Sequence, residues 1–146
     1  MRPSEILHAS RDAALRVRSI DDEVVELRDR IGVQGHTYGV HSKNGILDPM
    51  RKVDDMIDQS ADLRKERAEC HAQMLCGQLM IDGARECLSE TSEYVMRQYY
   101  VRGRSVHEIS RAIGRREQLC LAIIGAGTDA CDAHGCARLK ANAMGV

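Results

Sequence analysis

The sequence predicts an all-α protein, in which a long two-helix hairpin of coiled-coil type (residues 1–88) is followed by a C-terminal helix-turn-helix domain (residues 89–146). Three observations predict this class. The 146 residues include no Phe, no Trp and four Tyr, so the core must be built from Leu, Ile, Val, Ala, Met and Cys, a set typical of helices. Apolar residues recur every three or four positions along two long stretches. No stretch has the alternation that would predict a strand.

The first expected helix extends from Ser4, its N-cap, to Ile31. The segment "GVQGHTYGVHSKNG" follows it, with four glycines and an Asn-Gly pair. We therefore expect the helix to stop at Gly32 and a glycine-rich loop to occupy residues 32–47. The apolar stripe of this helix consists of Ile6, Ala9, Ala13, Val17, Ile20, Val24, Leu27 and Ile31.

The second expected helix extends from about Asp48 to Leu88, with Pro49 in its first turn. Two long helices with narrow apolar stripes cannot each stay exposed, so they should pack as an antiparallel hairpin. The alternative is that each pairs with another copy of the chain. The second stripe consists of Val53, Met56, Leu63, Cys70, Met74 and Ile81, with Ser60, Arg67 and Gly77 in phase.

The C-terminal segment has the start and stop signals of short helices. Ser89, Thr91 or Ser92 can cap a helix that stops at Gly103 and presents Tyr94, Val95, Met96, Tyr99 and Tyr100 as apolar contacts. "SVHE" (Ser105 to Glu108) fits a capping box for the next helix, whose Val106, Ile109 and Ile113 share one face. Gly114 permits a sharp turn into a third helix, Arg115 to His134, with Leu119, Cys120, Ile123 and Ile124 inward. This order is the helix-turn-helix plan.

The stretch "YVMRQYYVRGRSVHEISRAIGRRE" resembles region four of the bacterial sigma-seventy factors. With two long N-terminal helices and an end such as "DACDAHGCARL", the chain is similar to small phage-encoded regulators of the ArpU and RinA type. The motif covers residues 92 to 139, and the likeness of the remainder is one of architecture. The resemblance implies a regulator of phage or prophage transcription in the bacterial cytoplasm, with DNA and host RNA polymerase as partners.

On this resemblance the face that meets DNA begins with Arg115, Arg116, Glu117 and Gln118 and then becomes small and apolar. Arg115, Arg116 and Gln118 are expected at the start of the helix that enters the major groove, and Arg102, Arg104 and Arg111 nearer the phosphates. The whole chain has 21 basic and 22 acidic residues, but residues 92–118 have six arginines and three acids, 6 − 3 = +3, which is the local excess that phosphate binding needs. The expected DNA-binding residues are Arg102, Arg104, Ser105, Arg111, Arg115, Arg116 and Gln118.

A protein-binding module is the competing class. In it the helix-turn-helix serves as a scaffold, and the hairpin or the apolar third helix captures a host protein, as a phage-encoded inhibitor would. Arginines that only solubilise a helix surface would explain the same charge pattern. An enzyme is not expected, because His36 and His41 lie in the glycine-rich loop without a carboxylate or nucleophile beside them in the sequence.

The cysteines and histidines near the C-terminus form one candidate metal site. Cys131, His134 and Cys136 could hold zinc with Cys120 as a fourth ligand, but their spacing fits no standard finger, and Cys131 reads better as a small core residue next to a helix end. Cys70, His71 and Cys76 are read as helix positions. No cofactor, metal or membrane partner is expected, and no apolar run reaches the roughly 18 residues of a membrane span.

Overall fold

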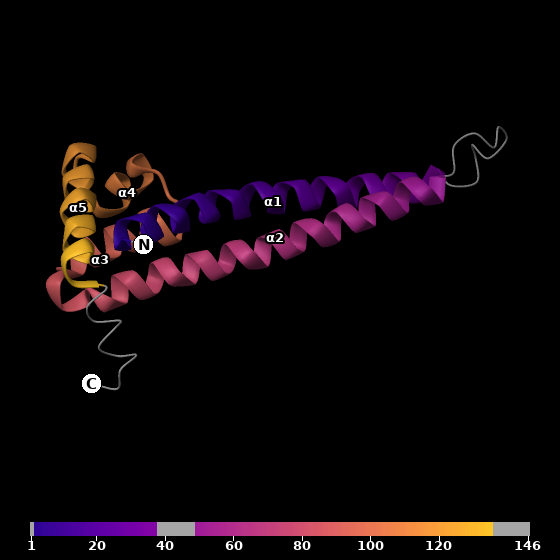
Figure 1. Ribbon diagram of the computed structural model, residues 1–146. Helices are drawn as coiled ribbons and strands as arrows, with labels where there is room; N and C mark the ends of the chain where they lie inside the picture. The colour runs from indigo at the N-terminus through magenta and orange to yellow at the C-terminus, as the bar shows by residue number, and fades with distance from the viewer. Residues whose placement is uncertain (1, 38–48, 136–146) are drawn as a thin grey trace. The chain divides into compact units, whose positions relative to one another are not determined.

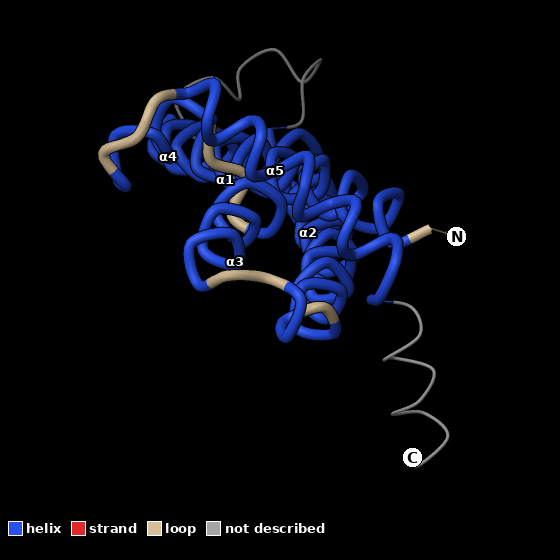
Figure 2. The backbone as a smooth tube through the Cα atoms, turned by 90° about the vertical axis from the view of Figure 1, so that its left-hand side faces the viewer, coloured by secondary structure: helices blue, strands red, loops and turns tan. Residues whose placement is uncertain are grey.

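The computed structural model describes residues 2–37 and 49–135, and this part of the chain is helical and contains no strand (Figures 1 and 2). The all-α prediction is therefore confirmed. A short 3₁₀ turn, Arg85–Cys87, follows the second helix, and wider π-helical turns, Arg97–Val101 and Cys131–Gly135, continue the third and fifth. The α-helices are α1 (Pro3–Thr37), α2 (Pro49–Gly83), α3 (Glu90–Met96), α4 (Val106–Ile113) and α5 (Glu117–Ala130).

Helix α1 begins at Pro3, so the predicted N-cap at Ser4 is wrong. Proline suits a first helical position because its missing N–H would have no partner there. The Glu5 carboxylate accepts a hydrogen bond from the Arg2 amide at 3.0 Å. The Ser4 amide, inside the first turn, donates to the Asp132 carboxylate at 2.8 Å. The carboxylates of Glu5 and Asp132 thus accept hydrogen bonds from amides that would otherwise have no partner at the start of α1.

The end of α1 also differs from the prediction. The helix passes through Gly32 and ends at Thr37, so His36 is helical and not in a loop. A glycine inside a helix is unfavourable by about 1 kcal/mol, and each residue added to an existing helix gains a further backbone hydrogen bond. A single glycine is therefore a weaker stop signal here than its sequence context indicates. His41 and the rest of the predicted loop, residues 38–47, lie outside the described residues.

Helix α2 begins at Pro49 and ends at Gly83, earlier than the predicted Leu88. The Ala84 amide is shared between the carbonyl oxygens of Met80 and Ile81, at 3.3 and 3.1 Å, as at many helix ends. Ala84 itself is fully buried. The backbone then tightens into the 3₁₀ turn and becomes extended at Leu88.

Two compact units make up the chain: the first unit (Met1–Leu15 with Cys70–Val146) and the second unit (Arg16–Glu69). This division differs from the predicted boundary at residue 88, because the first turns of α1 and the last turns of α2 belong with the C-terminal helices. The first unit has one hydrophobic core, to which α1, α2, α3, α4 and α5 all contribute. Its buried members are Leu7, Met80, Ile81, Ala84, Val95, Met96, Tyr100, Ile109, Cys120, Ile124 and Cys131.

Close helix contacts in the first unit depend on small residues. A Cβ atom added at Gly77 of α2 would lie 2.3 Å from the Ser10 hydroxyl of α1. One added at Gly127 of α5 would lie 2.2 Å from the Met96 sulfur of α3. Only glycine allows these approaches without a shift of the neighbouring side chain.

In the second unit, α1 and α2 lie side by side (Figure 1) and bury a narrow stripe of five side chains, Val17, Ile20, Leu27, Ser60 and Leu63. Surface ion pairs flank it: Arg16 donates to Glu66 at 2.7 Å and Arg67 donates to Asp21 at 2.7 Å. The hydrogen bond between Arg16 and Glu66 raises the pKa of Arg16 and lowers that of Glu66 from their ordinary values.

Candidate nucleic-acid interface

The candidate interface is the segment from the end of α3 to the first turn of α5. Ser89 caps α3, because its hydroxyl oxygen accepts a hydrogen bond from the Ser92 amide at 3.1 Å. The helix then widens into the π-helical turn, where the Arg102 amide donates to the Arg97 carbonyl at 3.0 Å. Gly103 follows with φ +65°, a left-handed value that ends the helix as predicted.

Helix α4 starts and stops at the predicted residues. The Ser105 hydroxyl oxygen accepts a hydrogen bond from the Glu108 amide at 3.2 Å, which is the serine half of the predicted capping box. Gly114 has φ +66° and ends α4, and its amide donates to the Ser110 carbonyl. These two residues make α4 a short helix between two sharp changes of chain direction.

Helix α5 starts at Glu117 and not at the predicted Arg115, which is a correction. Arg116 is the residue before the helix, with extended backbone (φ −71°, ψ 147°), and the Arg115 amide still donates to the Ser110 carbonyl at 3.1 Å. Two arginines therefore stand in the turn between α4 and α5. The reason is the left-handed Gly114, after which the chain needs two more residues to turn before a new helix can begin.

The first turns of α4 and α5 are linked by a contact that the sequence did not indicate. The His107 Nδ1 atom of α4 lies 2.7 Å from the Glu117 carboxylate of α5, and both side chains are exposed. The basic pair Arg115 and Arg116 directly precedes one of these residues, and the loop 102–105 directly precedes α4. This bond thus brings the starts of two helices to one exposed region.

Each predicted DNA-binding residue can now be placed. Arg111 is in the last turn of α4, and Gln118 is in the first turn of α5. Arg104 is half-buried, and the others are exposed. The structure gathers Arg111, Arg115, Arg116 and Gln118 around one turn, whereas Arg102, Arg104 and Ser105 lie in the loop before α4.

The exposed face of α5 has little positive potential. Between residues 117 and 135 there is no Lys or Arg, and the charged groups of α5 itself are Glu117 and Asp129. Leu119 and Leu121 are 44% and 53% exposed, so Leu119 does not point inward as predicted. The inward predictions for Cys120 and Ile124 are confirmed. Cations that could meet a phosphate therefore precede α5.

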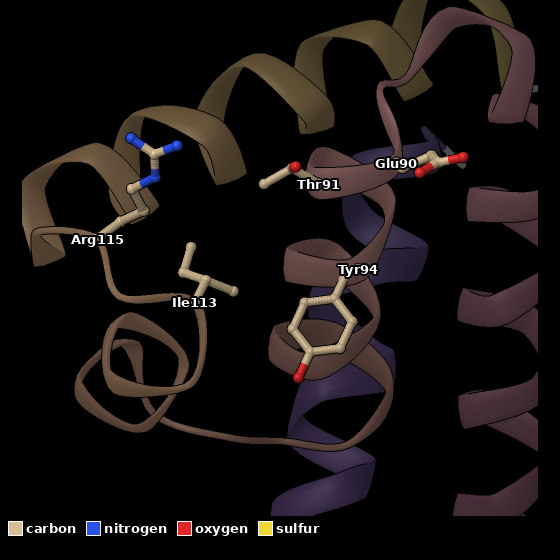
Figure 3. Close-up of a pocket in the computed structure, with 5 residues that line it drawn as sticks. All are labelled: Glu90, Thr91, Tyr94, Ile113 and Arg115. Carbon is tan, nitrogen blue, oxygen red and sulfur yellow. The ribbon is translucent and has the colours of Figure 1, made fainter.

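A surface groove of about 330 Å³ lies between α3 and the turn before α5. Thr91 and Tyr94 of α3 form one wall, and Ile113 and Arg115 form the other (Figure 3). Tyr94 is 41% exposed here, so it is not the core contact that the sequence predicts. The groove therefore has apolar side chains, Tyr94 and Ile113, close to Arg115 in the turn between α4 and α5.

The cysteines are placed by burial. Cys120 and Cys131 are fully buried, and burial raises the pKa of the Cys131 thiol to about 11, so this side chain is a neutral core residue. His134 is exposed, and Cys136 lies outside the described residues. Cys70 is buried while its neighbours His71 and Cys76 are exposed. In the part of the chain that the structure describes, no three His, Cys, Asp or Glu side chains are grouped to hold a metal ion.

Comparison of the chain with models of protein families, with curated proteins and with solved structures gave no match. None of the described helices is both long enough and apolar enough to cross a membrane.

Proposed function

We propose that α3, α4 and α5 form a helix-turn-helix unit that binds DNA, and that the chain is a regulator of phage or prophage transcription acting in the bacterial cytoplasm. The observation that carries this proposal is the turn between α4 and α5. A left-handed Gly114 is followed by two exposed arginines and then by a helix whose first turn exposes Gln118. In helix-turn-helix proteins the start of the second helix is the part that enters the major groove.

The contacts divide into two kinds. Arg116 and Gln118, at the start of α5, are placed to reach base edges, where arginine pairs with guanine and glutamine with adenine. Arg102, Arg104, Arg111 and Arg115 contact phosphates, as does the Ser105 hydroxyl. Because α5 beyond its first turn has no Lys or Arg and consists mainly of small and apolar residues, base contacts are confined to that turn. We therefore propose modest sequence preference and strong salt dependence.

The remaining architecture follows the same proposal. The segments of α1 and α2 in the second unit form a coiled-coil-like hairpin, supported by their buried stripe and the cross-helix ion pairs. Host RNA polymerase is the proposed protein partner, in line with the likeness to sigma region four.

The test is binding to labelled duplexes of varied sequence, over a salt series from about 50 to 200 mM. The four arginines assigned to phosphates predict a slope of the logarithm of the binding constant against that of salt of about −3 to −4. Arg104→Ala should weaken all duplexes alike and flatten the slope by about one, whereas Arg116→Ala and Gln118→Ala should relax sequence preference. Arg64→Ala, an exposed arginine of the second unit, is the matched control and should change neither. Absence of binding at the lowest salt refutes the proposal.

A second function is favoured by one specific observation. The exposed leucines lie on α5, which has no Lys or Arg. The groove beside Tyr94 adds further apolar surface. Such a surface is typical of protein-binding sites. In this case the chain is a protein-binding module, such as an inhibitor of a host protein, with the helix-turn-helix as scaffold. DNA binding separates the two functions. A protein-binding module should bind no duplex at the lowest salt, and it should capture a host protein, with that capture lost in Leu121→Glu and intact in Arg104→Ala.

A further inference from the structure

Helix α1 contacts the loop before α4 through Arg11. The guanidinium Nη1 atom donates hydrogen bonds to the carbonyl oxygens of Tyr99, at 2.7 Å, and Arg104, at 2.9 Å. Its central carbon lies 3.8 Å from the centroid of the Tyr99 ring, which is a cation–π distance. One side chain of α1 therefore joins the end of the π-helical turn to the loop that precedes α4.

The backbone of Arg104 is hydrogen-bonded through both its amide and its carbonyl. Its amide donates to the Gln98 carbonyl at 2.9 Å, and its carbonyl accepts the bond from Arg11. Both peptide groups of a residue are thus fixed, and the direction of its Cα–Cβ bond is fixed with them. The side chain of Arg104 leaves this backbone one residue before the cap of α4.

Two neighbours of Arg11 on α1 support the same loop. The Ser10 hydroxyl is buried and donates to the Tyr100 carbonyl at 3.0 Å. Gly103, in its left-handed conformation, lies against Ala14 so closely that a Cβ atom at residue 103 would be 3.1 Å from the Ala14 Cβ. Hydrogen bonds and a close contact therefore hold residues 99–104 along a full turn and more of α1.

We infer that Arg11 is a positioning residue of the DNA interface, which orients Arg104 toward the phosphate backbone. This inference rests on the proposed function. It makes α1 a part of the DNA-binding unit, although Arg11 and Arg104 are 93 positions apart in the sequence. Arg11 acts through its bonds to backbone carbonyls and its ring contact, which direct its guanidinium into the protein.

The first experiment measures the loop without DNA. Hydrogen exchange of the Arg102 and Arg104 amides, which donate to the carbonyls of Arg97 and Gln98, is followed in wild-type protein and in Arg11→Met, which keeps an unbranched apolar stem and removes the charge and donors. We expect exchange about tenfold faster in the variant, since bonds from charged donors are worth at least this factor. Arg2→Met, which removes an exposed cation of the same unit, is the control and should leave both amides unchanged.

The second experiment is a double-mutant cycle on DNA binding. Arg11→Met and Arg104→Ala should each weaken binding about tenfold, and the double variant should bind no more weakly than Arg104→Ala alone. Arg2→Met should change binding by much less. Arg11→Lys keeps the charge but not the planar ring contact, so it should recover part of the affinity. It also serves as the test variant if Arg11→Met does not fold.

Unchanged exchange at both amides overturns the inference, and so do additive losses in the cycle, which would mean that Arg11 contributes charge or stability independently of Arg104. If wild-type protein binds no DNA at low salt, the proposed function fails and the interface role of Arg11 fails with it. The exchange measurement distinguishes these failures, because it reports on the contact of Arg11 with the loop whether or not DNA binds.

Discussion

The first unit buries large side chains from five helices, whereas the second unit buries a single stripe between two. In the first, buried hydroxyls have distinct partners, as where the Tyr100 hydroxyl lies 2.8 Å from the Thr128 hydroxyl, while the buried Gln98 Oε1 atom has none among the described residues. In the second, polar contacts are ion pairs on the surface, such as Arg16 with Glu66. We therefore expect the first unit to have few alternative packings. We expect the second unit to tolerate substitution and its stability to depend on salt and pH.

The difference teaches where structural specificity resides in this chain. Tight packing and paired buried groups favour one conformation strongly, because every change leaves a cavity or an unpaired atom. Exposed ion pairs contribute little each and are screened by salt. The segments that present the arginines belong to the first unit, so the candidate interface stands on the better-defined part of the protein.

The largest expected contrast comes from one substitution made in both units. Leu7 in the first unit is 0% exposed and Leu27 in the second is 5% exposed. Leu7→Ala should lower the free energy of unfolding by about 3–5 kcal/mol, because the cavity is enclosed, and Leu27→Ala by about 2 kcal/mol, because a two-helix seam can close. Urea denaturation measures both. Equal losses would remove the distinction between the units.

A smaller effect is expected at the buried hydroxyl pair. The Thr128 hydroxyl donates to the Ile124 carbonyl at 2.7 Å, so Tyr100 is the donor to Thr128. Thr128→Val leaves the Tyr100 hydroxyl without a partner and should be unfavourable by about 1–3 kcal/mol. Tyr100→Phe removes the hydroxyl itself and should be unfavourable by about 0.5–1.5 kcal/mol. The reverse order in thermal unfolding would contradict this donor assignment.

Three glycines sharpen the comparison further. Gly103→Ala should destabilise by about 2 kcal/mol, since a left-handed residue with a side chain is strained and Ala14 is in contact. Gly114→Ala, equally left-handed but in open space, should destabilise by about 1 kcal/mol. Gly32→Ala in α1 meets no atom within 4 Å and should stabilise by up to about 1 kcal/mol. A destabilised Gly32→Ala would indicate that helix α1 does not persist there.

The smallest expected effect is on the acid stability of the second unit. The bond from Arg16 lowers the pKa of Glu66, so its contribution is present above the ordinary value of 4.5 and is lost as the pH falls below it toward the folded pKa. Glu66→Gln should therefore make the free energy of unfolding slightly less dependent on pH in this acid window. Near neutral pH it should leave the pH dependence of that free energy unchanged. Glu69→Gln, an exposed acid nearby, is the control. Parallel acid titrations by circular dichroism, with high salt reducing the difference, check this.

Much of the fold followed from local sequence patterns. The in-phase residues Ser60, Cys70, Gly77 and Ile81 are buried as their period predicts, because helical periodicity is set within a few turns of chain. The Ser105 cap and the glycine turns were predicted correctly for the same reason, since caps are local interactions, and Ser89 is one of the three candidates predicted for the cap of α3. The predicted ends of α1 and α2, the start of α5 and the inward position of Leu119 were wrong, because neighbouring helices decide them.

The contacts that define the candidate site could not be predicted in this way. Arg11 meets residues 88 and 93 positions away, Asp132 meets Ser4 128 positions away, and His107 pairs with Glu117 only because a turn folds α4 back on α5. Nothing in the local pattern around these residues indicates a partner. DNA binding itself stays a prediction, and the arginines around Gly114 are its structural support.

The burial of Leu7 and Ser10 has a consequence for the order of events during synthesis. Their partners include Met96, Tyr100 and Ile124, which are translated some ninety residues or more later. At about 5–20 residues per second, the ribosome leaves the apolar first turns of α1 without those partners for roughly 5–20 seconds. During that interval the nascent helix exposes an unburied face, so chaperone binding to the first turns of α1 should be strongest before residue 100 emerges and should end with the arrival of α5.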